Sequence, residues 1–234
     1  MSAIVLWAHS RSASTAFLRM MAERGDVSTV HEPLLHLTET GEAKLPGDIV
    51  VRDEHDLLAR LVSLGRTQHV FVKEVLDYPY QYLFDHPDEL AELTHTFIVR
   101  DPRQTIASHY AMKNTVTSPE IGYERLYELF ELVRAASGRE PFVLRAESLV
   151  TDAEQVVRAY CDHVGLPFKA EALQWRPGHR PEWERHQDWH ADVSRSNGFH
   201  DRRNEYVDTV DNNPVLRGFY EHHLPFYERL VAHS

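Results

Sequence analysis

Hydroxyl side chains and one guanidinium are concentrated near the start of the chain, between His9 and Thr15. Arg11, Ser12 and Ser14 lie there, directly before apolar residues that recur at helical spacing. The start of a helix offers unpaired N–H groups and a partial positive charge, and a guanidinium adds a planar set of donors. The stretch is therefore predicted to bind a phosphate or a sulfate. The alternative is an ordinary connection in which Ser14 or Thr15 caps the helix.

Three more charged residues follow short predicted strands. Glu32 comes after residues 28–30, Lys73 lies near the end of residues 69–75, and Arg100 follows residues 94–99. Ligands of parallel sheets bind beyond the carboxyl ends of the strands, so these side chains and Arg11 are expected at one edge of a sheet. The first loop contains neither the glycines nor the lysine of a Walker A sequence, which argues against a nucleotide triphosphatase.

The elements that must position these residues alternate along the chain. Strands are predicted at 3–7, 28–30, 69–75, 94–99 and 141–144, and helices at 53–64, 87–93, 123–136, 152–164 and 213–231, besides those that begin near residues 15 and 102. Residues 38–48 and 175–211 are predicted to be loops. The alternation indicates an α/β fold, with a central, mostly parallel β-sheet flanked by helices in a single domain over residues 1–234. Residues 175–211 are predicted to form a lid that contributes to the ligand sites.

The composition narrows the class of protein. Of the 234 residues 42% are hydrophobic, which is enough for a packed core, and the formal charge of −11 argues against general binding to nucleic acid or to anionic membranes. Cys161 is the only cysteine, so the sequence offers no disulfide and no cysteine-based metal site. A cytoplasmic location is predicted, since no signal peptide or membrane-spanning apolar run is found.

Three segments, in order, resemble motifs of sulfotransferases that use 3′-phosphoadenosine 5′-phosphosulfate (PAPS). Residues 11–15, Arg-Ser-Ala-Ser-Thr, closely resemble the Arg-Ser-Gly-Ser-Thr form of the 5′-phosphosulfate loop. Residues 97–110 are similar to the 3′-phosphate motif, in which a strand leads to an arginine, a proline and, eight positions after the arginine, a serine. Residues 144–168 resemble the Tyr-Glu-Asp-Leu segment and the Gly-Leu-Pro turn. The resemblance implies the P-loop NTPase-like sulfotransferase fold of a bacterial-type member that acts on small molecules.

The resemblance also implies how the donor is held. The 5′-phosphosulfate would lie against Arg11, Ser12, Ala13, Ser14, Thr15 and Ala16, and the 3′-phosphate between Arg100 and Ser108. Ala13 stands where many members have glycine, so the loop is expected to form without an easily reached positive φ at this position. The lysine- and glycine-rich 3′-phosphate loop of other members is missing, and the predicted substitute is Arg195, Asn197 and Gly198. The alternative for Arg100 is an ion pair with a neighbouring acid such as Asp101.

The implied reaction moves a sulfuryl group from PAPS to a hydroxyl or amine of a small-molecule acceptor by in-line displacement, and leaves 3′-phosphoadenosine 5′-phosphate (PAP). Some members use a histidine two residues after the lysine of the third strand, but Val75 stands there in this chain. Others use a glutamate after the second strand, and Glu32 is similarly placed. Glu32 is therefore predicted to be the general base, with His31 as the second candidate and Arg11 and Lys73 beside the transferred group. The alternatives are a helix-terminal acid for Glu32 and an ion pair with Glu74 for Lys73.

No metal is predicted, although His186 and His190 have the i, i+4 spacing that places two ligands on one helix face. Four aromatic residues are candidates for the acceptor pocket or the lid: Trp175, Trp183, Trp189 and Phe199. Two other functions remain open, a P-loop kinase-like phosphotransferase that uses ATP and a module that binds phosphoadenosine without catalysis. The acceptor is not specified by the sequence, and a homodimer is left open.

Overall fold

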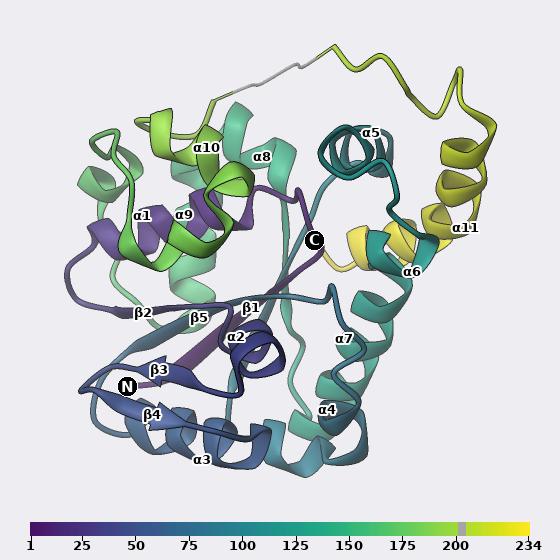
Figure 1. The fold of residues 1–234 in the computed structure, drawn as a ribbon. Coiled ribbons are helices and arrows are strands. Elements are labelled where there is room, and N and C mark those ends of the chain that lie inside the picture. Colours follow the sequence, from purple (N-terminus) through teal and green to yellow (C-terminus); the bar gives the residue numbers. More distant parts are fainter. Residues whose placement is uncertain (201–204) are drawn as a thin grey trace.

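The computed structural model describes residues 1–200 and 205–234, and its centre is a sheet of five strands in the order β2-β5-β1-β6-β7 (Figure 1). Every neighbouring pair in this sheet is parallel. The strands are β1 (Ala3–Ala8), β2 (Ser28–His31), β5 (Val70–Val75), β6 (Thr94–Val99) and β7 (Phe142–Arg145). The predicted α/β fold class and its five strands are confirmed.

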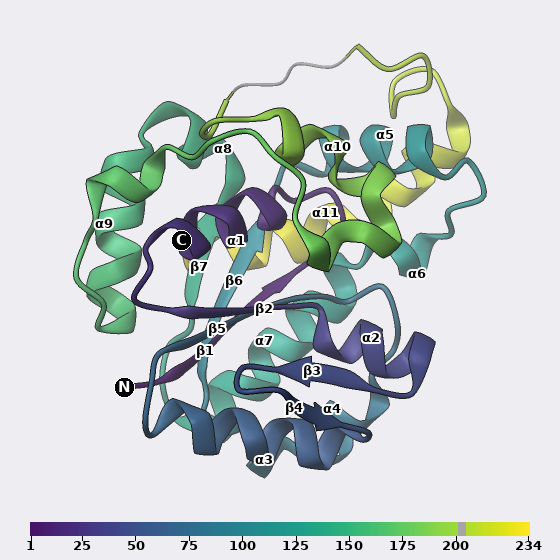
Figure 2. The ribbon, with the colours of Figure 1, turned by 60° about the vertical axis from the view of Figure 1, so that its left-hand side comes forward.

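Helices cover both faces of this sheet (Figures 1 and 2). The side chains of β1 alternate between the two apolar cores that result. Ile4 and Leu6 point into one core with helices α1 (Ser14–Glu23) and α9 (Ala153–Val164). Val5 and Trp7 point into the opposite core with α3 (Glu54–Gly65) and α7 (Tyr123–Ser137). A parallel strand that is buried on both faces is apolar throughout, as this one is.

A third, smaller core lies beyond the sheet, where α5 (Pro102–Met112) and α11 (Pro214–Val231) meet around Ile106 and Leu216. The short helices are α4 (Gln81–Asp85), α6 (Ser118–Ile121) and α8 (Ala146–Thr151), with a 3₁₀ turn at Pro87–Leu90. Among the described residues, no helix combines the length and the apolar character that crossing a membrane requires.

The predicted loop at residues 38–48 is wrong. Helix α2 (Pro33–Thr40) extends into it, and a two-stranded antiparallel hairpin follows, formed by β3 (Ala43–Leu45) and β4 (Ile49–Val51). Gly47 and Asp48 both have positive φ in the turn of this hairpin. The glycine and proline in this stretch mark the turn correctly, but three-residue strands are too short to show a period.

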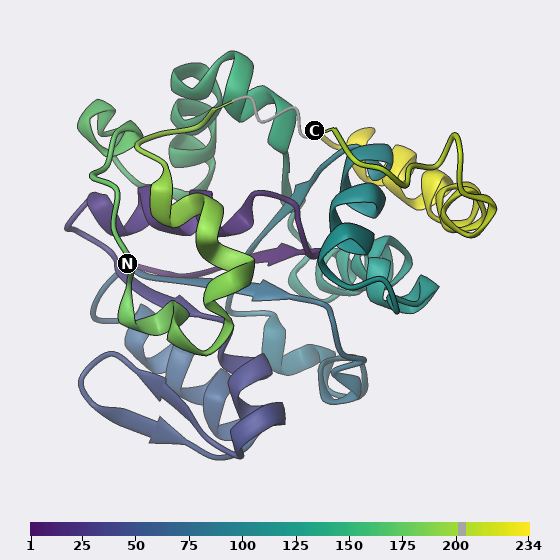
Figure 3. The same cartoon turned by 45° about the horizontal axis from the view of Figure 1, so that its top comes forward.

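The predicted loop at residues 175–211 is also partly helical. It contains a 3₁₀ turn at Pro181–His186 and α10 (Gln187–Arg195), which lies next to α1 (Figure 3). Two buried side chains, Trp183 and His190, anchor this segment. Because α10 is short and mostly polar, its contacts with α1 rather than its own sequence preference determine this helix.

Candidate functional site

The charged residues singled out in the sequence meet at the carboxyl edge of the sheet. Arg11 and Arg100 follow the adjacent strands β1 and β6, while Glu32 and Lys73 lie at the ends of the adjacent strands β2 and β5. All four line one cavity of about 920 Å³. That volume lies within the range usual for small-molecule and cofactor sites.

The loop after β1 has a strained backbone. Arg11 and Ala13 adopt positive φ, 65° and 69°, and Ala13 is the N-cap of α1. Within the described part of the chain, no side chain caps this helix, so the alternative in which Ser14 or Thr15 is the cap is wrong. The expectation that Ala13 would avoid positive φ is also wrong. A left-handed alanine costs about 1 kcal/mol or more, and such strain is found where backbone geometry matters for function.

Arg11 is the centre of the loop's polar contacts. Its Nε donates to Ser108 Oγ at 2.9 Å, and its Nη1 donates to the carbonyl of Trp189 at 3.2 Å. Asp192 of α10 lies 3.6 Å from Arg11 Nη2. Arg11 is therefore held between α5 and α10, with its guanidinium at the cavity wall.

Arg100 is tied to the same loop. Its Nη1 donates to the carbonyl oxygen of Arg11 at 3.2 Å, and its backbone N–H donates to Nε2 of His9 at 3.2 Å. Burial lowers the pKa of His9 to about 3, so the ring is neutral and can accept this bond. Asp101 accepts from the backbone N–H of Arg103 at the start of α5, and the described hydrogen bond of the Arg100 guanidinium goes to the loop rather than to this acid.

Two serines of the predicted donor site differ in their setting. Ser12 is fully buried, borders the cavity and, among the described residues, has no hydrogen-bond partner for its hydroxyl. An unsatisfied buried hydroxyl fits a site that a polar ligand completes. Ser108 is also buried, its hydroxyl accepts a hydrogen bond from Arg11, and it is not among the residues that line the cavity. Its contact with a phosphate stays a prediction.

Glu32 and Lys73 form a buried ion pair at the other side of the cavity. Lys73 Nζ donates to Glu32 Oε1, and Oε2 of Glu32 lies 3.7 Å from Nδ1 of His31. His31 and Lys73 lower the pKa of Glu32 to about 2 despite its burial, so Glu32 is a carboxylate. Lys73 contacts Glu32 rather than Glu74, contrary to the alternative considered above.

The backbone around Glu32 fixes its direction. Glu32 is the N-cap of α2 with φ 46°, and its own N–H donates to the carbonyl of Lys73 at 2.7 Å. Pro33 occupies the first helical position. Glu74, from the next position of β5, accepts the N–H of Leu34 at 2.7 Å and so fills the capping role. Glu32 thus lies at a helix terminus, as the alternative of a helix-terminal acid predicts. Its side chain does not cap the helix, however, and it lines the cavity.

The segment over residues 175–200 closes one wall of the cavity, though with only part of the predicted set. Trp189, Phe199 and Gly198 line the cavity. Trp175 and Trp183 are buried in the protein instead. Arg195 is exposed, and its Nε donates to the carbonyl of Ala191. The predicted Arg195 and Asn197 are exposed and outside the cavity lining, Arg195 in the last turn of α10 and Asn197 just beyond it.

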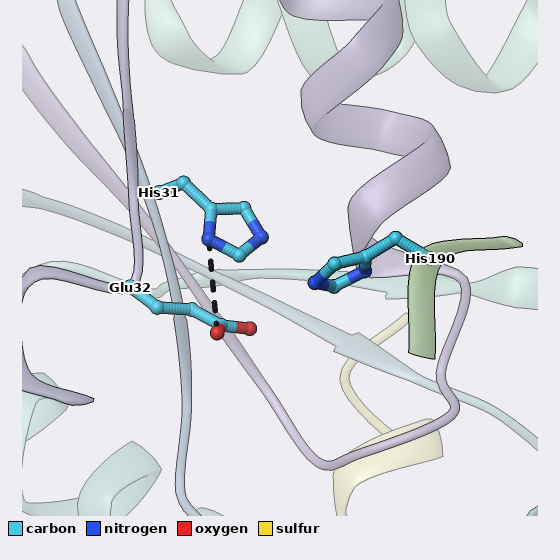
Figure 4. A group of neighbouring side chains, drawn as sticks. All are labelled: His31, Glu32 and His190. Carbon is cyan, nitrogen blue, oxygen red and sulfur yellow. Dashed lines mark ion pairs between the residues drawn. The ribbon is translucent and has the colours of Figure 1, made fainter. Parts of the chain in front are cut away.

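One group of side chains has metal-ligand character. His31, Glu32 and His190 each offer a ligand atom within 4.8 Å of the others, and all three are buried (Figure 4). This group contains His190 but does not depend on the i, i+4 spacing of His186 and His190. The side chain of His186 lies outside the described residues. Lys73 already donates to Glu32, and its ammonium would oppose a second cation at this carboxylate. The absence of a metal remains a prediction.

Sequence reasoning missed two cavity residues that face each other. Asp77 accepts a hydrogen bond from Ser10, whose Oγ lies 2.9 Å from each carboxylate oxygen. Both residues follow the paired positions Ala8 and Val75 by two residues. The sequence does contain one indication of this site: Asp77 is an acidic residue two positions after Val75, just past the end of a predicted strand.

Comparison with known proteins identifies the family of this chain. A model of the family described as "Sulfotransferase domain" matches residues 2–234. Two Arabidopsis thaliana proteins, branched-chain-amino-acid aminotransferase-like proteins 2 and 1, are each 27% identical to this chain and are matched over 100% and 97% of it. The chain spans only 42% and 41% of their lengths.

Among solved structures, the sulfotransferase domain from the Synechococcus PCC 7002 olefin synthase superposes with a TM-score of 0.58 at 16% identity. The match covers 95% of this chain and 94% of that one. At this identity the likeness supports the fold alone, whereas the family model covers nearly every residue of the chain. The chain therefore belongs to the sulfotransferase domain family.

Proposed function

We propose that this sulfotransferase takes a sulfuryl group from PAPS and transfers it to a hydroxyl or amine of a small molecule. The observation that supports this most is the pairing of two charge types in one cavity. Arg11 and Arg100 follow β1 and β6, and a buried carboxylate, Glu32, lies at the end of β2. Cations suit a polyanionic donor, and a carboxylate suits removal of a proton.

The residues of the loop fit such a donor. The start of α1, the unsatisfied hydroxyl of Ser12 and the guanidinium of Arg11 would hold the 5′-phosphosulfate. Arg100 would hold the 3′-phosphate. When bound, PAPS supplies an activated sulfuryl group and a phosphate leaving group.

Glu32 is the proposed general base. Its carboxylate takes the proton of the acceptor's hydroxyl or amine while the acceptor atom bonds to sulfur and the bond from sulfur to the bridging oxygen breaks. Negative charge grows on the leaving phosphate, where Arg11 and Lys73 stabilise it. For this, Lys73 turns part of its hydrogen bonding from Glu32 to the transferred group, which also frees Glu32 to accept the proton.

A thermal-shift comparison of PAP with ATP plus Mg²⁺ tests the donor. A ligand at 100 times its dissociation constant stabilises the folded state by about 2.7 kcal/mol, so PAP should raise the melting temperature clearly. ATP with Mg²⁺ should have little effect, since the loop has no Walker A lysine. The reverse ranking would favour an ATP-dependent phosphotransferase.

A further inference from the structure

Asp77 is a cavity carboxylate for which the proposed reaction has no role. It follows β5 and lines the same cavity as Glu32 and Lys73. Its partner Ser10 follows β1, the strand that leads directly to the donor loop. Asp77 therefore lies between the proposed base and the proposed donor site, which is where an acceptor must be held.

The hydrogen bonding of Asp77 leaves capacity for a ligand. Ser10 Oγ lies 2.9 Å from both Oδ1 and Oδ2, and a hydroxyl has a single hydrogen to donate. Two carboxylate oxygens can accept about four hydrogen bonds. The bond from Ser10 also fixes the carboxylate relative to Arg11, one residue along the chain.

The charges around Asp77 keep it near its titration point. Burial and the negative charge of Glu32 raise the pKa of Asp77 to about 6, while Ser10 and Lys73 act in the opposite direction and Glu120 adds a further increase. Asp77 is then mainly ionised at neutral pH. It gains a proton at a pH where Glu32, with a pKa near 2, stays a carboxylate.

We infer that Asp77 is an acceptor-binding residue, which receives a hydrogen bond from a second polar hydrogen of the acceptor while Glu32 faces the reacting one. The inference rests on the proposed function. It predicts acceptors with two polar groups, either a diol or an amino alcohol whose second group is an ammonium. An acceptor with a single hydroxyl would leave a partly buried carboxylate without that partner and would bind less well.

Three probes with one ring test this: cyclohexanol, cyclohexane-1,2-diol and 2-aminocyclohexanol, each assayed with PAPS. The wild-type protein should use the diol or the amino alcohol with a kcat/KM at least about tenfold above that of cyclohexanol, as expected for a hydrogen bond to a charged group. Asp77→Asn should abolish this preference mainly through KM. A stronger effect on the amino alcohol than on the diol would identify an ammonium as the preferred group. Asp162→Asn, an exposed acid on α9, is the matched control.

Other readouts separate this inference from a structural role and from the proposed function. The KM of the preferred probe should rise as the pH falls through about 6 in the wild type and be flat in Asp77→Asn. Equal use of all three probes, or a preference that survives in Asp77→Asn, would overturn the inference while leaving sulfuryl transfer intact. Failure of the wild type to bind PAP in calorimetry, or to transfer to any probe, would instead count against the proposed function and this inference with it.

Discussion

The two halves of the cavity handle charge in different ways. In the donor half, contiguous residues from Ser10 to Ala16 present Arg11, a helix start and backbone N–H groups, and Arg100 adds a second cation. In the acceptor half, Glu32 is compensated by Lys73, and side chains from separate elements make the wall. The donor half gathers cations for binding, whereas the acceptor half combines the ion pair of Glu32 and Lys73 with a second carboxylate, Asp77.

This difference in charge indicates which half should control donor affinity and which should control the reaction rate. The cation of Arg100, which is assigned to the non-reacting 3′-phosphate, acts on donor affinity, because this phosphate carries the same charge before and after the reaction. A carboxylate poised at the acceptor acts on the rate, because its proton is transferred only in the transition state. Substitutions in the two halves should therefore separate turnover from donor affinity.

The largest effect is expected in the acceptor half, from Glu32→Gln. Glutamine keeps the size of Glu32 but cannot take a proton, and loss of general-base help costs about 10² to 10⁴ in rate. Turnover should fall by that factor while the affinity for PAP stays near normal. The melting temperature should drop, because the substitution leaves the buried ammonium of Lys73 without its carboxylate partner. Glu154→Gln, an exposed carboxylate on α9, controls for the charge change. Turnover within about threefold of wild type would remove Glu32 from this role and make His31 the next candidate.

In the donor half, Arg100→Ala should mainly weaken donor affinity, whereas Glu32→Gln mainly lowers turnover. Loss of a charged hydrogen-bonded partner should weaken PAP binding by about 2 kcal/mol, or roughly 30-fold in Kd. The variant should also discriminate poorly between adenosine 5′-phosphate and PAP, which differ in the 3′-phosphate. Calorimetry measures both affinities. Arg103→Ala is the control, because Arg103 is an exposed cation near Arg100 that pairs with Asp211 outside the cavity lining. Retained discrimination would mean that Arg100 only holds the loop.

The same contrast explains what the sequence could predict. The donor half is encoded locally: strand, loop and helix are consecutive, so Arg11 to Ala16 and the strand-end position of Arg100 could be predicted from patterns. The acceptor half depends on strand order and on distant side chains. The contact of Lys73 with Glu32 follows from the pairing of β2 with β5, and the approach of His190 follows from how α10 packs against α1. Neither contact is visible in a local hydrophobic period. The structure leaves the predicted Arg195 exposed and outside the cavity lining.

A smaller effect should follow in the donor loop from Ala13→Gly. Glycine removes the cost of the left-handed conformation at φ 69°, so the variant should be more stable by about 1 kcal/mol, which corresponds to a rise of roughly 2–4 °C in melting temperature. Ala16→Gly makes the same replacement in the first turn of α1, where it should instead destabilise the protein by about 0.5–1 kcal/mol. Equal effects of the two substitutions in calorimetric melting would contradict the strain assigned to the loop.

The smallest effect concerns the contact that joins the two halves through α10. Asp192 lies 3.6 Å from Arg11, and its side chain is 47% exposed, so the pair is worth at most about 1 kcal/mol. A phosphate that binds Arg11 must compete with this carboxylate for the same guanidinium. Asp192→Asn should therefore tighten PAP binding by up to about fivefold at low salt, and the gain should shrink as salt screens both interactions. Titrations at two salt concentrations, with the exposed Asp188→Asn on the same helix as control, measure this. If PAP binds more weakly to Asp192→Asn than to the wild type, Asp192 does not compete with the donor but helps to hold α10 over it.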